Sequence, residues 1–425
     1  MPWPNGQDAY FSAGGTSTAT VPGPVQANAL LVNGGSTANL TGTSSVNATT
    51  WVSVGNGSAG TLGIQGSVSL TAASSFRLGD SWGVPGNVNQ TGGTVTLNGE
   101  TRIAHWPSET STYTLGSGNL VSNGQFNVAW DGVGIFVQGG GSSQFNNGFR
   151  INRAGSATLN GGSLQANSVS VGARASGSTA TLNVNNGTLT TSWLGLGDGW
   201  GANGTVNHTG GTVTINGQTR VGHWGGETST YTLSGGSLVA NGGFNVAWDG
   251  TGIFTQTGGT SAFNGGLAIR TLGTVELAGN GTSTASWIGM GYNGNGAMLR
   301  IKDTHHLTVG NLFVGEYNAA GTIEQSGGTV TVQNQLRLGH WGNQVSRYTL
   351  SDGELHLTGT PSGGGPEYAG ILHIGVDGTG VFTQTGGDAS AYGIILDNRS
   401  GTTGVDTFTL DGGTFTVGPW GIGQG

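Results

Sequence analysis

Cysteine is absent from this chain, lysine occurs once, and charged residues of either sign make up only 8%. The absence of cysteine rules out disulfide staples, which a long solenoid does not need. The net charge of −8 comes with no basic patch, so nucleic acid and anionic membrane are disfavoured as partners. No apolar run approaches the roughly 18 residues that a membrane span requires, so no membrane insertion is expected.

The N-terminus has neither a basic n-region nor an apolar h-region, so it does not read as a signal peptide. Either a signal was removed and Met1 was added, or Met1 is native and export uses another route. We favour the first, because Gly/Thr/Asn-rich solenoids with almost no lysine are surface products. Residues 1–14 are predicted to form an N-terminal cap or an atypical first coil, which solenoids need.

Glycine is abundant, yet Val, Ile, Leu, Phe and Trp recur at regular spacing, which predicts an ordered chain. In residues 209–259, short runs that alternate apolar and polar residues are separated by Gly and Asn. Such alternation is typical of strands with one buried face, and Gly and Asn tolerate the left-handed conformation of a corner. One circuit of three strands and three corners has the size of a β-helix coil.

A glycine marker that precedes the second run of each circuit recurs from Gly15 to Gly413, with a mean spacing of about 25 residues. The sequence therefore predicts an all-β fold, a single parallel β-helix of about 17 coils with three strands per coil.

A longer repeat lies on top of this period. LGDSWG at 78–83 returns at 196–201, TRIAHW at 101–106 returns at 219–224, and FNVAWDG at 126–132 returns at 244–250 with small changes. We interpret 15–425 as β-helix with a five-coil superrepeat at 93–210, 211–327 and, in part, 328–425. A loop insertion is expected at 359–368.

Asparagine follows the marker by five residues in many coils, where its amide can bond the amide one coil away. This structural ladder is predicted at Asn47, Asn98, Asn123, Asn146, Asn167, Asn216, Asn241 and Asn264.

Aromatic residues recur 12 to 16 positions after the marker. Coils are about 4.8 Å apart, so these rings could stack along one edge. The stack either stabilises a corner or offers flat faces to pyranose rings. If the ring is buried, Trp224→Ala should cost about 3 kcal/mol. The candidate carbohydrate-binding residues are Trp82, Trp106, Trp130, Trp200, Trp224, Trp248 and Trp341.

No catalytic or metal constellation is found. His105, His223 and His340 lie five coils apart, roughly 24 Å, which excludes a shared metal. Asp131 and Asp249 have no matching acid on the preceding coil. We therefore expect no cofactor, no metal and no catalytic residues, and hence a protein that is not an enzyme.

The segments FTQTGGTS, TLSGGSLVANG and VNHTGGTVTING resemble the autotransporter-associated β-strand repeats of secreted Gram-negative proteins, many of which carry PEP-type sorting signals. The resemblance covers the chain from about Asn28 onward. It implies a right-handed parallel β-helix, an extracellular or cell-surface location, and a structural or adhesive role without catalytic residues.

The leading expectation is thus a non-catalytic structural or adhesive protein that assembles end to end into fibres, with residues 1–14 meeting the coil near Gly425 of another copy. Its partners would be itself and a polysaccharide or cell-surface glycan. Alternatives are a carbohydrate-binding protein that uses the Trp sets, an ice-binding β-helix that uses the T-x-T runs at 94–96, 188–190 and 212–214, and a polysaccharide-active enzyme.

Overall fold

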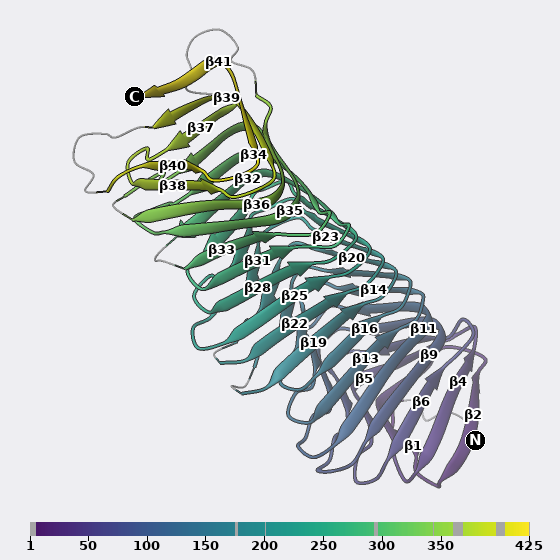
Figure 1. The fold of residues 1–425 in the computed structure, drawn as a ribbon. Coiled ribbons are helices and arrows are strands. Elements are labelled where there is room, and N and C mark those ends of the chain that lie inside the picture. Colours follow the sequence, from purple (N-terminus) through teal and green to yellow (C-terminus); the bar gives the residue numbers. More distant parts are fainter. Residues whose placement is uncertain are drawn as a thin grey trace. The chain divides into compact units, whose positions relative to one another are not determined.

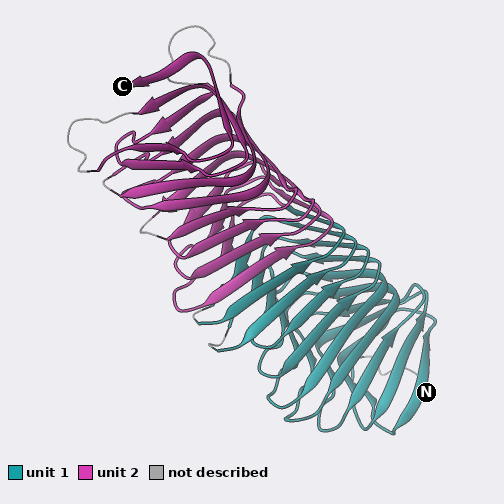
Figure 2. Ribbon diagram, viewed as in Figure 1, with its two compact units in different colours: residues 1–214 teal, residues 215–425 magenta. Residues whose placement is uncertain are grey.

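The computed structural model describes residues 6–174, 177–199, 201–292, 296–342, 344–359, 369–396 and 404–424. They divide into two compact units, residues 1–214 and 215–425, coloured separately in Figure 2. Within the described ranges the regular elements are all strands, so no helix there could cross a membrane.

Short strands connected by tight corners make up unit 1. They are β1 (Ala9–Phe11), β2 (Gly15–Val21), β3 (Val25–Val32), β4 (Ser36–Gly42), β5 (Ser45–Val54), β6 (Gly60–Ile64), β7 (Ser69–Ala72), β8 (Ser75–Leu78), β9 (Gly86–Leu97), β10 (Glu100–Ile103), β11 (Thr110–Ser122), β12 (Phe126–Val128), β13 (Val133–Gln138), β14 (Ser142–Phe145), β15 (Phe149–Ile151), β16 (Ser156–Leu159), β17 (Ser163–Ala166), β18 (Val169–Val171), β19 (Thr179–Val184), β20 (Thr188–Thr191), β21 (Leu194–Leu196) and β22 (Asn203–His208).

The boundary between the units falls inside β23 (Thr212–Ile215). The strands of unit 2 are β24 (Thr219–Val221), β25 (Thr228–Leu233), β26 (Ser237–Ala240), β27 (Phe244–Val246), β28 (Thr251–Gln256), β29 (Thr260–Phe263), β30 (Leu267–Arg270), β31 (Gly273–Leu277), β32 (Thr282–Tyr292), β33 (Ala297–Ile301), β34 (His306–Val314), β35 (Gly321–Leu338), β36 (Val345–Leu357), β37 (Ile371–Ile374), β38 (Thr379–Gln384), β39 (Asp388–Leu396), β40 (Thr407–Leu410) and β41 (Thr414–Gln424).

Each unit contains three stacks of parallel strands, which we name sheets A, B and C in the order in which the chain visits them (Figure 1). In unit 1, β13 and β16 belong to sheet A, β14 and β17 to sheet B, and β15 and β18 to sheet C. Longer strands such as β9 and β11 turn a corner and contribute to both sheet A and sheet B. Each residue therefore pairs with its counterpart one coil further on.

These pairings confirm the predicted fold class, an all-β right-handed parallel β-helix with three strands per coil. In the described part of the segment 1–14, β1 pairs with β3 in sheet C. Residues 360–368, nearly all of the predicted insertion at 359–368, lie outside the described residues.

The core is apolar and continuous within each unit because every strand alternates inward and outward side chains. One part of the core is an aromatic cluster of unit 1 in which ring centroids lie 4.6 to 6.3 Å apart. Burial of each ring contributes roughly 1.5 to 3 kcal/mol to the stability of the coil. The cluster comprises Tyr113, Phe126, Phe136, Phe145 and Phe149.

The corner from sheet A to sheet B requires glycine. Gly141 has a φ of 65°, and a Cβ there would lie 2.3 Å from the carbonyl oxygen of Gly118 in the preceding coil. Gly162 repeats this arrangement against Gly141, again at 2.3 Å. Both the left-handed backbone and the close approach of the coils exclude a side chain, which explains the recurring marker.

A buried glutamine at the end of many sheet-A strands holds this corner from inside. The Gln256 amide donates to the carbonyls of Gly259 and Thr282, both at 3.1 Å, and its Oε1 accepts from Ser261 and Ser283 at 2.8 and 2.9 Å. It thus links its own corner to the next coil through four hydrogen bonds. Amide groups in the same place are Gln90, Gln138, Gln325 and Gln384.

Candidate functional site: the Arg-His-Trp edge

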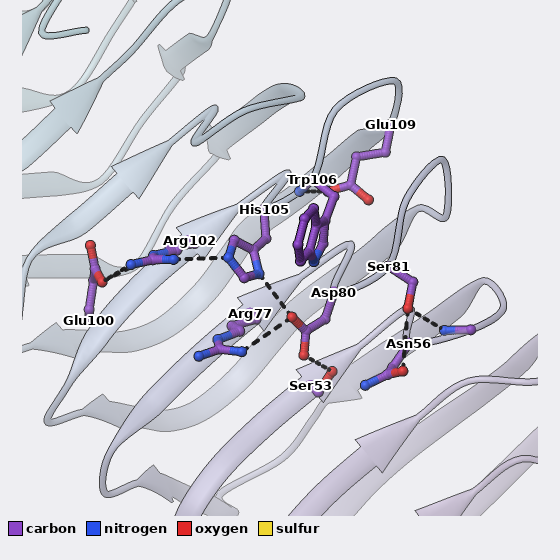
Figure 3. Close-up of polar contacts among 11 residues, drawn as sticks. Ser53, Asn56, Arg77, Asp80, Ser81, Glu100, Arg102, His105, Trp106 and Glu109 are labelled. Carbon is purple, nitrogen blue, oxygen red and sulfur yellow. Dashed lines mark hydrogen bonds and ion pairs between the residues drawn. The ribbon is translucent and has the colours of Figure 1, made fainter.

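The turn that leads from sheet C back to sheet A carries most of the side chains that could support chemistry. We name it the Arg-His-Trp edge, which comprises residues 77–82, 100–109 and 127–132 in unit 1 and residues 218–227, 245–250, 314–317 and 335–341 in unit 2. In unit 1, β8 and β10 pair in parallel with Arg77 opposite Arg102. The residues that follow these strands therefore meet across neighbouring coils, as Figure 3 shows for Asp80 and His105.

A chain of hydrogen bonds connects three consecutive coils at this edge (Figure 3). Asp80 accepts from the Ser53 hydroxyl and from Nδ1 of His105, both at 2.9 Å. Arg102 donates to Nε2 of His105 at 2.9 Å and to Glu100 at 2.7 and 3.0 Å. A guanidinium can only donate, so Nε2 must accept and Nδ1 must donate to the carboxylate. Both ring nitrogens are thereby occupied, and neither is available as a general base or metal ligand.

Two carboxyl groups at this edge have opposite pKa shifts. Burial would raise the pKa of Asp80, but hydrogen bonds from His105 and Ser53 and the charge of Arg77 outweigh it, so the pKa lies below its ordinary value. Burial, together with the nearby charge of Asp80, raises the pKa of Glu109 to about 8, although the Trp106 amide donates to it at 3.0 Å. Glu109 is only 3% exposed and packs over Gly79.

An acid and a base with separated pKa values can form a catalytic pair. Here, however, both carboxyl groups are buried beneath the edge, where a polymeric substrate does not reach them. The described residues also contain no group of three or more His, Asp or Glu side chains that could hold a metal ion.

The pKa of Glu109 gives a testable dependence of stability on pH. In the unfolded chain this carboxyl group ionises near 4.5, whereas in the folded protein it keeps its proton up to about pH 8. Its stabilising contribution is therefore complete below about pH 4.5 and is lost as the pH rises through 8, by at most about 1.4 kcal/mol per pH unit. Glu109→Gln should flatten this decline in denaturant unfolding measured at pH 5, 6.5, 8 and 9.

Glu324→Gln is the matched control, because Glu324 is exposed and pairs with Arg300 at 3.0 Å. This variant should keep the wild-type pH dependence. A Glu109→Gln protein whose stability declines with pH as steeply as the wild type would contradict the assignment.

The same edge recurs in unit 2. Arg337 donates to Nε2 of His340 at 3.0 Å, and Nδ1 of His340 bonds Glu316 at 2.7 Å. Arg220 likewise lies 2.6 Å from Nε2 of His223. The arginine and histidine of the TRxxHW-type repeats thus hold the same contact wherever they occur in the described chain.

Two tryptophans of the edge are clamped between arginines. The ring centroid of Trp130 lies 3.9 Å from the guanidinium carbon of Arg102 and 4.1 Å from that of Arg174. Trp248 lies at 3.7 Å from Arg220 and 3.6 Å from Arg270. Each guanidinium over an indole contributes about 0.5 to 2 kcal/mol.

This arrangement differs from the expected Trp-on-Trp stack. Leu78, Ile103 and Val128 lie in register, but the next tryptophan follows them by four, three and two residues, respectively. Trp82, Trp106 and Trp130 therefore occupy different positions along the turn. No ring contact joins any two of these three described indoles.

The remaining candidate tryptophans differ in exposure. Trp82, Trp106 and Trp341 are 68%, 43% and 49% exposed. Trp224 is half-buried, and Trp200 lies outside the described residues. Trp106 and Trp341 each contact the preceding histidine ring, and Trp341 also meets Tyr317 edge-on at 5.6 Å.

Six of the eight predicted ladder asparagines bond one another. Asn123 donates to Asn98 at 2.8 Å, and Asn146 to Asn123 at 2.7 Å. In unit 2, Asn241 donates to Asn216 and Asn264 to Asn241 at 3.0 and 2.9 Å.

Asn47 and Asn167 have no amide hydrogen bond to another described member of the set. None of the eight has a positive φ, unlike Ala104, Ala129 and Ala247 in the edge turn. The expected left-handed corner therefore does not lie at these asparagines, whose amides instead run along the stack.

No family model, curated protein or solved structure matches the chain, so the resemblance to autotransporter-associated repeats stays a prediction.

Proposed function

We propose that this chain is a non-catalytic structural or adhesive β-helix protein, located outside the cell or on the surface of a Gram-negative-type bacterium. The proposal rests on the Arg-His-Trp edge, whose polar and aromatic side chains are engaged in contacts with one another. His105 uses both nitrogens, Arg102 divides its donors between Glu100 and His105, and the Trp130 ring contacts two guanidinium groups, those of Arg102 and Arg174. These contacts join one coil to the next and engage both nitrogens of the His105 ring.

Turnover assays test this proposal. Incubation with neutral and acidic polysaccharides should release neither reducing ends nor unsaturated sugars, whereas immobilised protein should retain bacterial or host cells. Polysaccharide cleavage that disappears in His105→Ala but persists in an exposed-site variant such as Tyr10→Ala would overturn the proposal, as would failure to retain any cell type.

Exposed indoles favour a second candidate, a carbohydrate-binding surface protein. Trp82 and Trp106 lie on neighbouring coils of unit 1 with much of their rings open to solvent. Indole faces suit the apolar faces of pyranose rings. The double variant Trp82→Ala/Trp106→Ala should weaken binding on a glycan array at least tenfold, with unchanged unfolding.

Tyr10→Ala is the control for this experiment, because Tyr10 is an equally exposed aromatic residue of β1, at 60%. It should leave glycan binding unchanged. Equal binding by the wild type and the double tryptophan variant would rule out the edge as a sugar site.

A further inference from the structure

A groove of about 610 Å³ runs over sheet B of unit 1, on a different face from the Arg-His-Trp edge. It crosses five consecutive coils, from β9 through β11, β14 and β17 to β20. Strand register places its outward side chains in two columns. One includes Asn119, Ser142 and Ser163, and the other includes Gln144, Gln165 and Thr190.

No charged residue lines this groove. Hydroxyl and amide groups both donate and accept hydrogen bonds, as do the hydroxyl groups of a sugar. An anionic ligand would find no cation here, and an apolar ligand would bury these groups without partners, at a cost of about 1 to 3 kcal/mol each. The lining therefore fits an uncharged, hydroxyl-rich ligand.

Several of these groups are available to a ligand. Gln165 and Thr190 make no side-chain hydrogen bond to any described residue, and Gln165 is exposed. Asn119 accepts from Ser142 at 2.6 Å, which leaves its amide NH₂ as a donor. Gln144 donates to Asn146 at 2.8 Å, which leaves its Oε1 as an acceptor.

The geometry favours a repeating polymer. Equivalent groups recur once per coil, about 4.8 Å apart, so a chain laid along the groove meets the same chemistry at each step. A protein partner would call for an apolar or aromatic centre, whereas Val121 is the one outward apolar side chain of the lining. The surface is also hollowed, and amides interrupt the threonines at 94–96 and 188–190, unlike the flat threonine array expected for ice binding.

We propose that the sheet-B groove of unit 1 binds a strand of neutral polysaccharide laid along the stack of coils. The hydroxyl and amide columns recognise the sugar hydroxyls. Because the groove and the exposed tryptophans lie on different faces, binding at one can fail while binding at the other persists.

Affinity gel electrophoresis of the full chain tests this proposal. The probes are xyloglucan, galactomannan and dextran as neutral polymers, and polygalacturonate as an acidic one. Gln144→Ala/Gln165→Ala should raise the Kd for a bound neutral polymer at least tenfold. Gln26→Ala is the matched control, because Gln26 is an exposed residue of the same outward column outside the groove. It should bind as the wild type does.

Circular dichroism must show that both variants fold alike. A second variant adds positive charge to the groove. Gln144→Lys/Gln165→Lys should gain affinity for the acidic polymer polygalacturonate. The proposal is overturned if none of the neutral polymers slows the migration of the wild-type protein, or if only polygalacturonate does. It is also overturned if binding of neutral polymers survives Gln144→Ala/Gln165→Ala, or if a protein ligand such as gelatin binds the groove instead.

Discussion

Replacing Gln256 with Leu is expected to lower the free energy of unfolding by roughly 3 to 6 kcal/mol, the largest effect of any single substitution considered for this chain. The side chain is fully buried, and its four hydrogen bonds satisfy the carbonyls of Gly259 and Thr282 and the hydroxyls of Ser261 and Ser283. Leucine has nearly the same volume but removes all four bonds: the Gly259 carbonyl keeps only the bond from the Thr282 amide, and the buried Ser261 and Ser283 hydroxyls lose the amide oxygen that accepts from them. Denaturant unfolding followed by circular dichroism measures the loss.

Gln333→Leu provides the comparison within the same unit. Gln333 is exposed and makes no side-chain hydrogen bond to a described residue, so its replacement should change stability by less than about 0.5 kcal/mol. If the two variants were equally stable, the buried amide would not hold the corner.

The second large effect is expected for Asp80→Ala, at about 3 kcal/mol. The Asp80 carboxylate is nearly buried. Its removal takes away the acceptor of the Ser53 hydroxyl and of the Nδ1–H of His105, and the negative partner of Arg77. Because the pKa of Asp80 is lowered in the folded protein, its contribution is present above the unfolded value of about 3.8 and fades as the pH falls below it. The difference between wild type and variant should therefore shrink under acid conditions.

Glu100→Ala tests whether burial is the cause. Glu100 also bonds an edge residue, Arg102, but its side chain is 35% exposed, so the expected loss is below about 1 kcal/mol. A larger loss for Glu100→Ala than for Asp80→Ala would show that the Asp80 contacts do not hold neighbouring coils together.

The fold could be read from the sequence because its signals are local and repeated. A Gly at the sheet A to sheet B corner, such as Gly141, is required by its own φ and by the carbonyl of the coil below, so it recurs at the period of the coil. The alternating runs beside it can bury only one face. Together these features predict strands, corners and stacking without any knowledge of long-range contacts.

The positions of the tryptophans could not be read in the same way. Counting from the sheet A corner predicts equivalent positions for them, whereas the position of each indole is set by the end of the sheet-C strand and by the number of turn residues that follow it. Val128, Ile103 and Leu78 pair in register, yet their turns reach the next indole after different numbers of residues. An arginine clamp also needs residues from three coils, as with Arg102, Trp130 and Arg174, and no local pattern brings these together.

The buried glutamines and Glu109 also have signals in the sequence, and both are weak. Gln256 lies in the FTQTGG segment, where it reads as one polar residue of a threonine-rich strand, although amides recur at that place in other coils. Glu109 begins ETSTYTL, which is repeated exactly at 227–233, so the repeat itself marks this glutamate as a recurring structural position. The pKa of Glu109 is raised first by burial and then by the charge of Asp80 in the preceding coil, and neither can be read from a local sequence pattern.

A double-mutant cycle on Arg102 and Trp130 tests most directly the central claim, that the Arg-His-Trp edge is built to hold neighbouring coils together. The variants are Arg102→Gln, Trp130→Leu and the combination, and the measured quantity is the free energy of unfolding. The guanidinium lies 3.9 Å from the indole centroid, so a coupling of about 1 kcal/mol or more is predicted. Additive losses, with no coupling beyond about 0.3 kcal/mol, would contradict the claim.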